Sequence, residues 1–225
     1  MIVTIDGPAG AGKSSVARAL AKRLGFRFLD TGATYRALAY VAASRSWPNH
    51  EEELGRRAEQ LDIQIEKGRV LVDGEDVTPH LRSAQVKNRL REIADNQQIR
   101  ALLVRLQQQY GATGDLVTEG RDQGTVVFPG AECKIYLTAS AEERAKRRAQ
   151  ELQGQGQSVD LDQVLRDQEE RDRRDADRTV GPLAQADDAL VVVTDGMTFD
   201  EVVDHLEMLV RSAPHRMRRP PTQDN

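Results

Sequence analysis

The sequence has one cysteine, few aromatic residues and no excess of basic charge. A lone thiol cannot form a disulfide within the chain, so we expect Cys133 to pack beside a strand. Aromatic residues make up 4% of the 225 residues, which argues against a surface that stacks on single-stranded nucleic acid. The net charge is −4, whereas proteins whose main partner is nucleic acid carry a basic excess. We therefore expect no nucleic-acid partner.

Long apolar runs and a targeting signal are missing as well. No run approaches the roughly 18 to 20 apolar residues that a membrane-spanning helix requires, so we expect no membrane association. The opening residues, MIVTIDG, predict a short strand, because a leader would begin with a basic segment followed by a longer apolar one. The sequence therefore predicts a cytoplasmic protein.

Short apolar segments alternate with segments of helical periodicity along most of the chain. This alternation is typical of a parallel sheet with crossover helices, and it predicts an α/β fold. We expect five core strands, at residues 2–5, 26–29, 116–118, 134–137 and 189–193.

Local signals add detail to this α/β pattern. Residues 63–77 alternate around two glycine turns and predict a small antiparallel insertion. The pairs Ser140 with Glu143 and Thr198 with Glu201 have the spacing of capping boxes at helix starts. Asp160 is placed to cap a third, highly charged helix that ends ahead of residue 182.

A glycine-rich phosphate loop lies between the first strand and the first helix. It matches the pattern G-x-x-x-x-G-K-[ST], in which backbone N–H groups and a helix N-terminus cradle phosphate oxygens. Lys13 is predicted to neutralise the transferring phosphoryl group, and the Ser14 hydroxyl to bind Mg²⁺. We expect ATP to bind at Gly7, Pro8, Ala9, Gly10, Ala11, Gly12, Lys13, Ser14 and Ser15.

Two further polar segments follow predicted strands. They are LDTGATYR at residues 29–36 and TEGRDQGTVVFP at residues 118–129. In a parallel sheet, ligands bind at the carboxyl ends of the strands, so both segments are expected to face the cleft of the phosphate loop. A single arginine is more often a solvated surface residue; it is the clustering that favours a binding site.

The charged helix predicts a mobile lid. Arg171, Arg174, Asp175 and Arg178 have i, i+3, i+4 and i+7 spacing, which places them on one face. An exposed helix with paired charges is the alternative. Phosphoryl transfer needs positive charge and the exclusion of water, so an arginine-rich lid suits a kinase.

The motifs together resemble the bacterial cytidylate kinases, a family of nucleoside monophosphate kinases. The resemblance covers residues 2–210 and rests on IDGPAGAGKSS, LDTGATYR, GEDVT with LRS after it, EGRDQGTVVFP, ASAEERAKRR and RDRRDADRTVGPL. It implies transfer of the γ-phosphoryl group of ATP to CMP or dCMP, with Mg²⁺, by a protein that is often a monomer.

The resemblance also implies residue roles. Lys13, Arg171 and Arg178 match catalytic positions, and Arg144 or Arg148 is expected under the adenine of ATP. The matches to the acceptor pocket are Thr31, Tyr35, Arg36, Arg100, Arg121, Asp122, Arg171 and Asp175.

The same resemblance implies a division of the chain into three working parts and a tail. Residues 1–34, 96–152 and 181–211 correspond to a phosphate-loop core. Residues 35–95 correspond to an acceptor-nucleotide lobe with the β insertion, and residues 153–180 to the lid. The proline-rich and basic residues 212–225 are expected to be disordered.

Three positions depart from the family pattern. Glu119 stands where the family has aspartate, Gln123 where it commonly has a hydrophobic residue, and Arg91 where a serine contacts cytosine. Base selectivity depends on such buried partners. A kinase for UMP, AMP or shikimate, and an ATP-hydrolysing switch protein, are therefore the alternatives to be distinguished.

Overall fold

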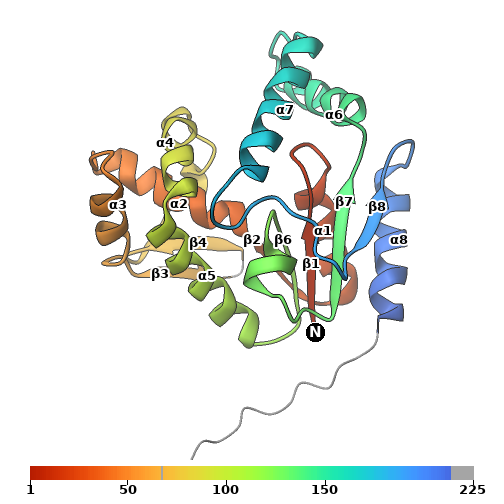
Figure 1. Ribbon diagram of the computed structural model, residues 1–225, viewed down its shortest axis with the longest axis horizontal. Coiled ribbons are helices and arrows are strands. Elements are labelled where there is room, and N and C mark those ends of the chain that lie inside the picture. The colour runs from red at the N-terminus through yellow and green to blue at the C-terminus, as the bar shows by residue number, and fades with distance from the viewer. Residues whose placement is uncertain (67, 214–225) are drawn as a thin grey trace, which may run out of the picture.

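The computed structural model describes residues 1–66 and 68–213, and its centre is a parallel sheet (Figure 1). The five strands lie in the order β2-β6-β1-β7-β8, which confirms the predicted number of core strands. All four neighbouring pairs are parallel. The strands are β1 (Ile2–Asp6), β2 (Arg27–Asp30), β6 (Leu116–Gly120), β7 (Cys133–Thr138) and β8 (Leu190–Val193).

Helices cover both faces of this sheet. On one face, α1 (Lys13–Leu24) and α8 (Phe199–Ser212) bury their apolar sides against β1, β7 and β8. On the other face, Leu29 and Leu116 pack with Phe128, beside α5 (Gln97–Ala112) and the π-helical turn η2 (Gln123–Val127). Burial of these side chains holds the carboxyl ends of the strands in fixed positions.

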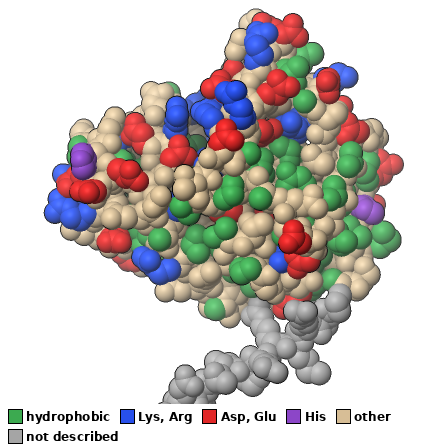
Figure 2. Space-filling view, viewed as in Figure 1, with side chains coloured by type: hydrophobic (Ala, Val, Ile, Leu, Met, Phe, Trp, Pro, Cys, Tyr) green, Lys and Arg blue, Asp and Glu red, His purple; other side chains and the backbone are tan. Residues whose placement is uncertain are grey.

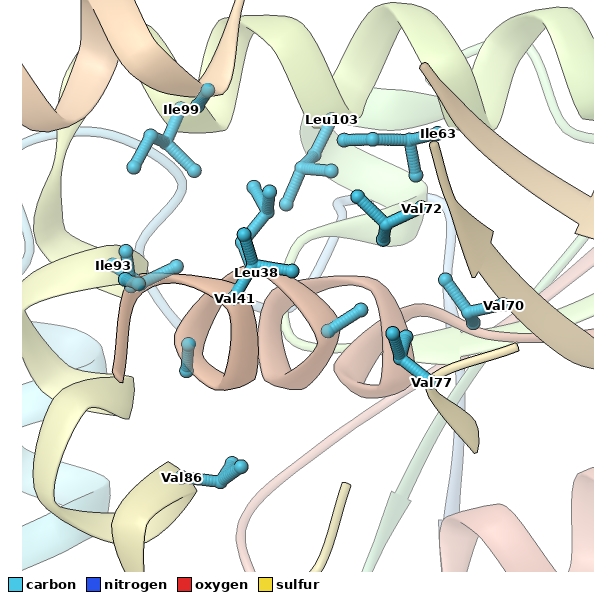
Figure 3. Packing of buried hydrophobic residues seen from close by; sticks show 14 of the residues in the cluster. Leu38, Val41, Ile63, Val70, Val72, Val77, Val86, Ile93, Ile99 and Leu103 are labelled. Carbon is cyan, nitrogen blue, oxygen red and sulfur yellow. The ribbon is translucent and has the colours of Figure 1, made fainter. Parts of the chain in front are cut away.

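A side lobe follows β2 in the chain and contains a further hydrophobic cluster. Leu38 and Val41 lie in its centre, with Ile93 on one side of them and Val72 on the other (Figure 3). Its antiparallel sheet has the order β3-β4-β5, as predicted for residues 63–77. The lobe comprises α2 (Thr31–Ser44), α3 (Glu51–Ala58), β3 (Ile63–Glu66), β4 (Arg69–Val72), β5 (Glu75–Asp76), η1 (Thr78–His80) and α4 (Ala84–Asp95).

Two packed helices, α6 (Ala141–Gly154) and α7 (Leu161–Ala176), stand above the carboxyl ends of the strands (Figure 1). Asp160 caps α7, as the sequence predicts: its side chain accepts hydrogen bonds from the N–H groups of Asp162 and Gln163. Because Gly154 is the last residue of α6, the break between the helices comes after it, at Gly156, whose φ is +76°. We call α6 and α7 the helical pair.

The two predicted capping boxes have different outcomes. At α8 both halves are present: Thr198 accepts from the N–H of Glu201, and the Glu201 carboxylate accepts from Thr198. At α6 only one half forms, because the N–H of Ser140 donates to Asp195 instead. The prediction of a second full capping box was therefore wrong.

The remaining predictions concern the cysteine, the membrane and the C-terminus. Cys133 is a free, buried thiol in β7, which confirms a packing role. No helix within residues 1–66 and 68–213 is long and apolar enough to cross a membrane. Ser212 belongs to α8 and not to the predicted tail, most of which, residues 214–225, lies outside the described residues.

Candidate active site

The phosphate loop connects β1 to α1 at the centre of the sheet. Its first residue, Gly7, has φ +146° and lies directly against the backbone of β7. A Cβ at this position would overlap the carbonyl oxygen of Leu137, so no other residue fits. The loop ends at Gly12, and α1 begins at Lys13 with its first N–H groups free to face an anion.

Lys13 is buried at the start of α1. Its Nζ donates a hydrogen bond to the carbonyl oxygen of Pro8 at 2.6 Å. Burial and then the repulsion of the Arg121 guanidinium lower the pKa of Lys13 to about 7. The positive charge of Arg171 lowers this pKa as well, so both arginines lie near the buried amine. The negative charge of an incoming phosphate would favour the protonated form of Lys13.

Ser14 and two carboxylates form the candidate metal position. The Ser14 hydroxyl donates to Glu119 Oε1 at 2.8 Å, and Glu119 lies opposite Asp30 in the register of β6 and β2. Burial and the nearby charge of Asp30 raise the pKa of Glu119. A dication beside these oxygens would relieve that repulsion, and hydroxyl and carboxylate oxygens are the ligands of Mg²⁺.

This donor set is incomplete as a metal cage. Within residues 1–66 and 68–213, no group of three or more His, Cys, Asp or Glu residues has the arrangement of a metal site. Mg²⁺ characteristically takes few protein ligands and completes its shell with water and substrate phosphates. The residues therefore fit Mg²⁺ that arrives with a nucleotide, held by Ser14 with Glu119 beside it.

Asp6 joins the phosphate loop to the next polar segment. Its carboxylate accepts hydrogen bonds from the N–H groups of Gln123 at 2.9 Å and Gly124 at 2.7 Å. Burial raises the pKa of Asp6 to about 6, although these two hydrogen bonds oppose the change. Sequence reasoning did not single out Asp6; its place directly before the glycine loop was the available signal.

A buried ion pair, which we call the floor of the cleft, joins α5 to the segment after β6. Arg100 of α5 is bonded to Asp122, and each side chain is less than 10% exposed. Arg100 also donates to the carbonyl oxygen of Ala94 at 3.2 Å and lies 5.6 Å from the ring centroid of Tyr35. Burial raises the pKa of Asp122, and that of Tyr35 to about 12. Tyr35 is therefore a neutral wall of the cleft.

Gly181 closes over the same pair. Its carbonyl oxygen accepts from Arg100 at 3.4 Å, and its φ is +62°. A side chain here would overlap both the Arg100 guanidinium and the Asp122 carboxylate. The chain beyond the helical pair thus returns directly to this ion pair.

Asp175 gathers two arginines at the inner end of α7. It accepts from Arg121 Nε at 2.8 Å and from Arg178 at 2.7 Å, and its side chain is 6% exposed. Burial alone would raise the pKa of Asp175, but Arg121 and Arg178 outweigh burial and lower it. The carboxylate is consequently ionised and fixes both guanidinium groups toward the cleft.

Other arginines line the open part of the cleft. Figure 2 shows basic side chains gathered in the notch between the helical pair and the side lobe. Arg36 is bonded to Asp30 at 3.0 Å, whereas Arg171 makes no ion pair with any residue that the structure describes. Arg171 is exposed at the surface of the cleft. The surrounding protein removes part of the water around its guanidinium group, and this desolvation, together with the charge of Arg121, lowers the pKa of Arg171. Surplus positive charge is what an anionic substrate requires.

Some sequence-predicted residues have other surroundings. Thr31 is buried, and its hydroxyl donates to the carbonyl oxygen of Glu119 at 2.7 Å. Arg174 is exposed and lies 3.6 Å from Glu170 of the same helix, so its charge is paired within α7, as in the alternative of an exposed helix with paired charges. Helical spacing alone placed Arg174 with its neighbours.

The two arginines expected near adenine have different positions. Arg144 is buried and donates to the carbonyl oxygen of Ala9 at 2.7 Å. It also pairs with Asp172 of α7, which accepts from the Ala9 N–H at 2.8 Å. Arg148 is instead exposed and paired with Glu151. The helical pair thus touches the phosphate loop through Arg144 and Asp172, and Asp172 was not identified from the sequence.

The departures from the family pattern are also located. Gln123 is buried, and its Oε1 accepts from the Thr118 hydroxyl at 3.0 Å, so its polarity is directed inward. The Arg91 side chain is 72% exposed and lies 3.7 Å from Asp95. Arg91 therefore lies outside the buried floor formed by Arg100 and Asp122.

A parallel sheet with a phosphate loop at its centre and an arginine-lined cleft beside it defines a phosphotransferase of the phosphate-loop kinase class. Comparison with protein families agrees: residues 3–212 match the model of the cytidylate kinase family. The chain belongs to the cytidylate kinase family.

Two relatives with high sequence identity support this membership. The chain is 46% identical over 213 residues to "Cytidylate kinase" of Rhodopirellula baltica, covering 94% of this chain and 93% of that one. It is 46% identical over 208 residues to "Cytidylate kinase" of Desulfitobacterium hafniense, covering 91% and 90%. A solved structure, shikimate kinase from Bacteroides thetaiotaomicron, aligns with a TM-score of 0.47 at 13% identity over 94% of this chain and 98% of that one.

Proposed function

We propose that this enzyme transfers the γ-phosphoryl group of ATP to CMP or dCMP, releasing ADP and CDP or dCDP. The observation that carries the proposal is that α7 contacts both sides of one cleft: its Asp172 accepts from the Ala9 N–H of the phosphate loop, and its Asp175 accepts from Arg121 after β6. Donor and acceptor phosphates can therefore meet between cations contributed by separate elements. Family membership supplies the substrate class.

The donor half of the reaction is assigned to the phosphate loop. Within residues 7–15, the backbone N–H groups of residues 10–15 would hold the ATP phosphates, because Pro8 has no N–H and that of Ala9 donates to Asp172. Lys13 would follow the charge of the transferring group. Mg²⁺ would be held by the Ser14 hydroxyl with Glu119 beside it, and when bound it neutralises phosphate charge. Glu119 is a longer carboxylate than the family's aspartate, and it already reaches Ser14.

The acceptor half is assigned to the floor and the arginines of the cleft. The acceptor phosphate would be bound by Arg36, Arg121 and Arg171, because these arginines supply positive charge at the open side of the cleft. The pair Arg100–Asp122 would bind or orient the base, with Tyr35 as a wall and Thr31 holding the adjacent backbone. Asp175 would orient Arg121 near the ribose and phosphate.

Residues 153–180, which contain α7, are assigned as the lid. Arg171 and Arg178 would approach the transferring phosphoryl group when the lid closes, and closure would exclude water that could otherwise hydrolyse ATP. The acceptor is already an anionic phosphate, so no residue has to act as a general base. The division into core (1–34, 96–152 and 181–211), acceptor lobe (35–95) and lid (153–180) belongs to the same proposal. The proposal also includes that the enzyme is a monomer and that it acts in the cytoplasm.

The test measures ADP release from ATP and Mg²⁺ with CMP, dCMP, UMP, AMP or GMP as the single acceptor. A reaction without acceptor and the Lys13→Ala variant are the controls for hydrolysis and for contaminating kinases. We expect turnover with CMP and dCMP to exceed that with the other acceptors. Preference for UMP or AMP would replace the proposed acceptor, and turnover without acceptor would favour an ATP-hydrolysing switch.

A further inference from the structure

Arg178 connects the helical pair to the side lobe. It follows the end of α7, and its Nε donates to Asp95 Oδ1 at 3.0 Å, while the other side of its guanidinium bonds Asp175 at 2.7 Å. Asp175 belongs to α7, the helix that Arg178 follows. Asp95 is the last residue of α4, so it is the contact that relates Arg178 to the opposite wall of the cleft.

The position of Asp95 is fixed by its neighbours. The preceding carbonyl, that of Ala94, accepts from Arg100 at 3.2 Å, and Arg100 is itself bonded to buried Asp122. The end of α4 is therefore anchored on the floor of the cleft. A carboxylate on this anchored end has a defined place for Arg178 to meet.

Asp95 is also unfavourable for its own helix. A negative side chain in the last turn repels the partial negative charge of the helix C-terminus. The Asp95 side chain is 46% exposed, and that of Arg178 is 20% exposed. The ion pair compensates the local cost, but an exposed pair of this kind contributes little to folding. The arrangement is therefore better explained by the position that it gives to Arg178.

We propose that Asp95 is a positioning residue for the kinase reaction: it holds the lid residue Arg178 over the cleft when the lid, residues 153–180, is closed. Asp95 and Asp175 grip the guanidinium from two elements, so Arg178 reaches the transferring phosphoryl group only when lid and side lobe are in register. This inference rests on the proposed function, in which Arg178 acts on the phosphoryl group. Nothing in it requires Asp95 to touch a substrate.

The first experiment compares steady-state kinetics of Asp95→Asn, Asp95→Glu and wild-type enzyme with CMP. We expect Asp95→Asn to lower kcat roughly fivefold and to change the KM for CMP by less than about twofold, since the contact serves the closed state. Asp95→Glu keeps the charge and should recover part of kcat. The melting temperature of Asp95→Asn should be equal to that of wild type or slightly higher, because an unfavourable helix charge is removed.

The matched control is Asp177→Asn. Asp177 is an exposed acidic neighbour of Arg178 and forms no ion pair within the described ranges 1–66 and 68–213. Its replacement removes the same charge near the same arginine, and kcat should remain within about twofold of wild type. An equal loss in Asp177→Asn and Asp95→Asn would overturn the proposal, because the loss would then reflect net charge and not a specific contact.

A double-mutant cycle separates this inference from the proposed function. If Asp95 acts through Arg178, then Asp95→Asn should have little further effect on kcat in the Arg178→Ala background. Independent, multiplying losses would overturn the positioning role while leaving Arg178 in place. A wild-type enzyme that does not use CMP would instead overturn the proposed function, and unchanged kcat in Arg178→Ala alone would remove the basis for both residues' roles.

Discussion

The phosphate loop and the arginine-lined cleft lie side by side, but they depend on different parts of the chain. In the loop, the backbone does most of the work: Gly7 packs against the backbone of β7, and α1 starts directly at Lys13. In the cleft, the work is done by charged side chains from several elements, such as Arg100 of α5, Arg121 after β6 and Asp175 of α7. A continuous segment of sequence thus encodes the loop, whereas tertiary packing assembles the cleft.

The difference implies different sensitivities. A loop that depends on one cation should lose its chemistry when that cation is removed, without loss of fold. A cleft held by paired charges should respond most to changes that displace a pair, and least to changes of exposed charges at its rim. The following predictions test this comparison.

The largest effect is expected for Lys13→Ala. The ammonium group is the only lysine charge in the phosphate loop motif, so kcat should fall on the order of 10³-fold. The fold should persist, because the variant removes a buried charge and leaves the backbone unchanged. Steady-state rates and thermal unfolding check both statements, with Lys22→Ala, an exposed lysine of the same helix, as control. A near-normal rate would contradict the phosphate-loop assignment.

The same comparison explains what sequence reasoning could predict. The loop, the five strands and the side-lobe hairpin follow from local patterns, and the structure confirms them. Partners across long sequence distances, such as Asp6 with Gln123, Asp172 with Ala9 and Asp95 with Arg178, have no such local pattern. Arg174 shows the converse: its spacing matched a functional face, but it pairs with its neighbour Glu170.

The next largest effect is expected for Gly181→Ala. The added methyl group would displace the Arg100–Asp122 pair, so kcat/KM for the acceptor should fall roughly 10- to 100-fold. Gly196→Ala is a matched control, because Gly196 has φ +72° but no atoms near its missing Cβ. It should cost about 1 kcal/mol of stability and no activity. Equal kinetic losses in the two variants would mean that backbone strain, and not the displaced pair, causes the effect.

A pH effect on ATP binding should be smaller, about tenfold between pH 6 and pH 8. The free enzyme holds the pKa of Lys13 near 7, and bound phosphates would favour the charged ammonium. At pH 8 the free amine is mostly neutral, so binding takes up nearly one proton and affinity falls; at pH 6 little uptake is expected. Calorimetry in buffers of different ionisation enthalpy measures the number of protons taken up on ATP binding, with adenosine as the phosphate-free control.

The stability of the folded protein should change with pH in the opposite direction to ATP affinity. Lys13 titrates near 7 in the folded protein and near 10.5 when unfolded, so the unfolded chain binds more protons between these values. The contribution of Lys13 to the stability of the nucleotide-free enzyme should therefore rise with pH across this window. Denaturant unfolding of wild type and Lys13→Met at pH 7 and pH 9 isolates it. Identical pH dependence in the two proteins would contradict a lowered pKa.

The smallest effect is expected for Arg91→Ser, which restores the residue of the family pattern. Because the Arg91 side chain is 72% exposed and lies 3.7 Å from Asp95, it contributes little to the buried floor of the cleft. The KM for CMP and the preference for CMP over UMP should stay within about twofold of wild type. A larger change in preference would mean that Arg91 turns toward the base when the acceptor binds. The rim of the cleft would then need ligand-dependent rearrangement, which the phosphate loop does not.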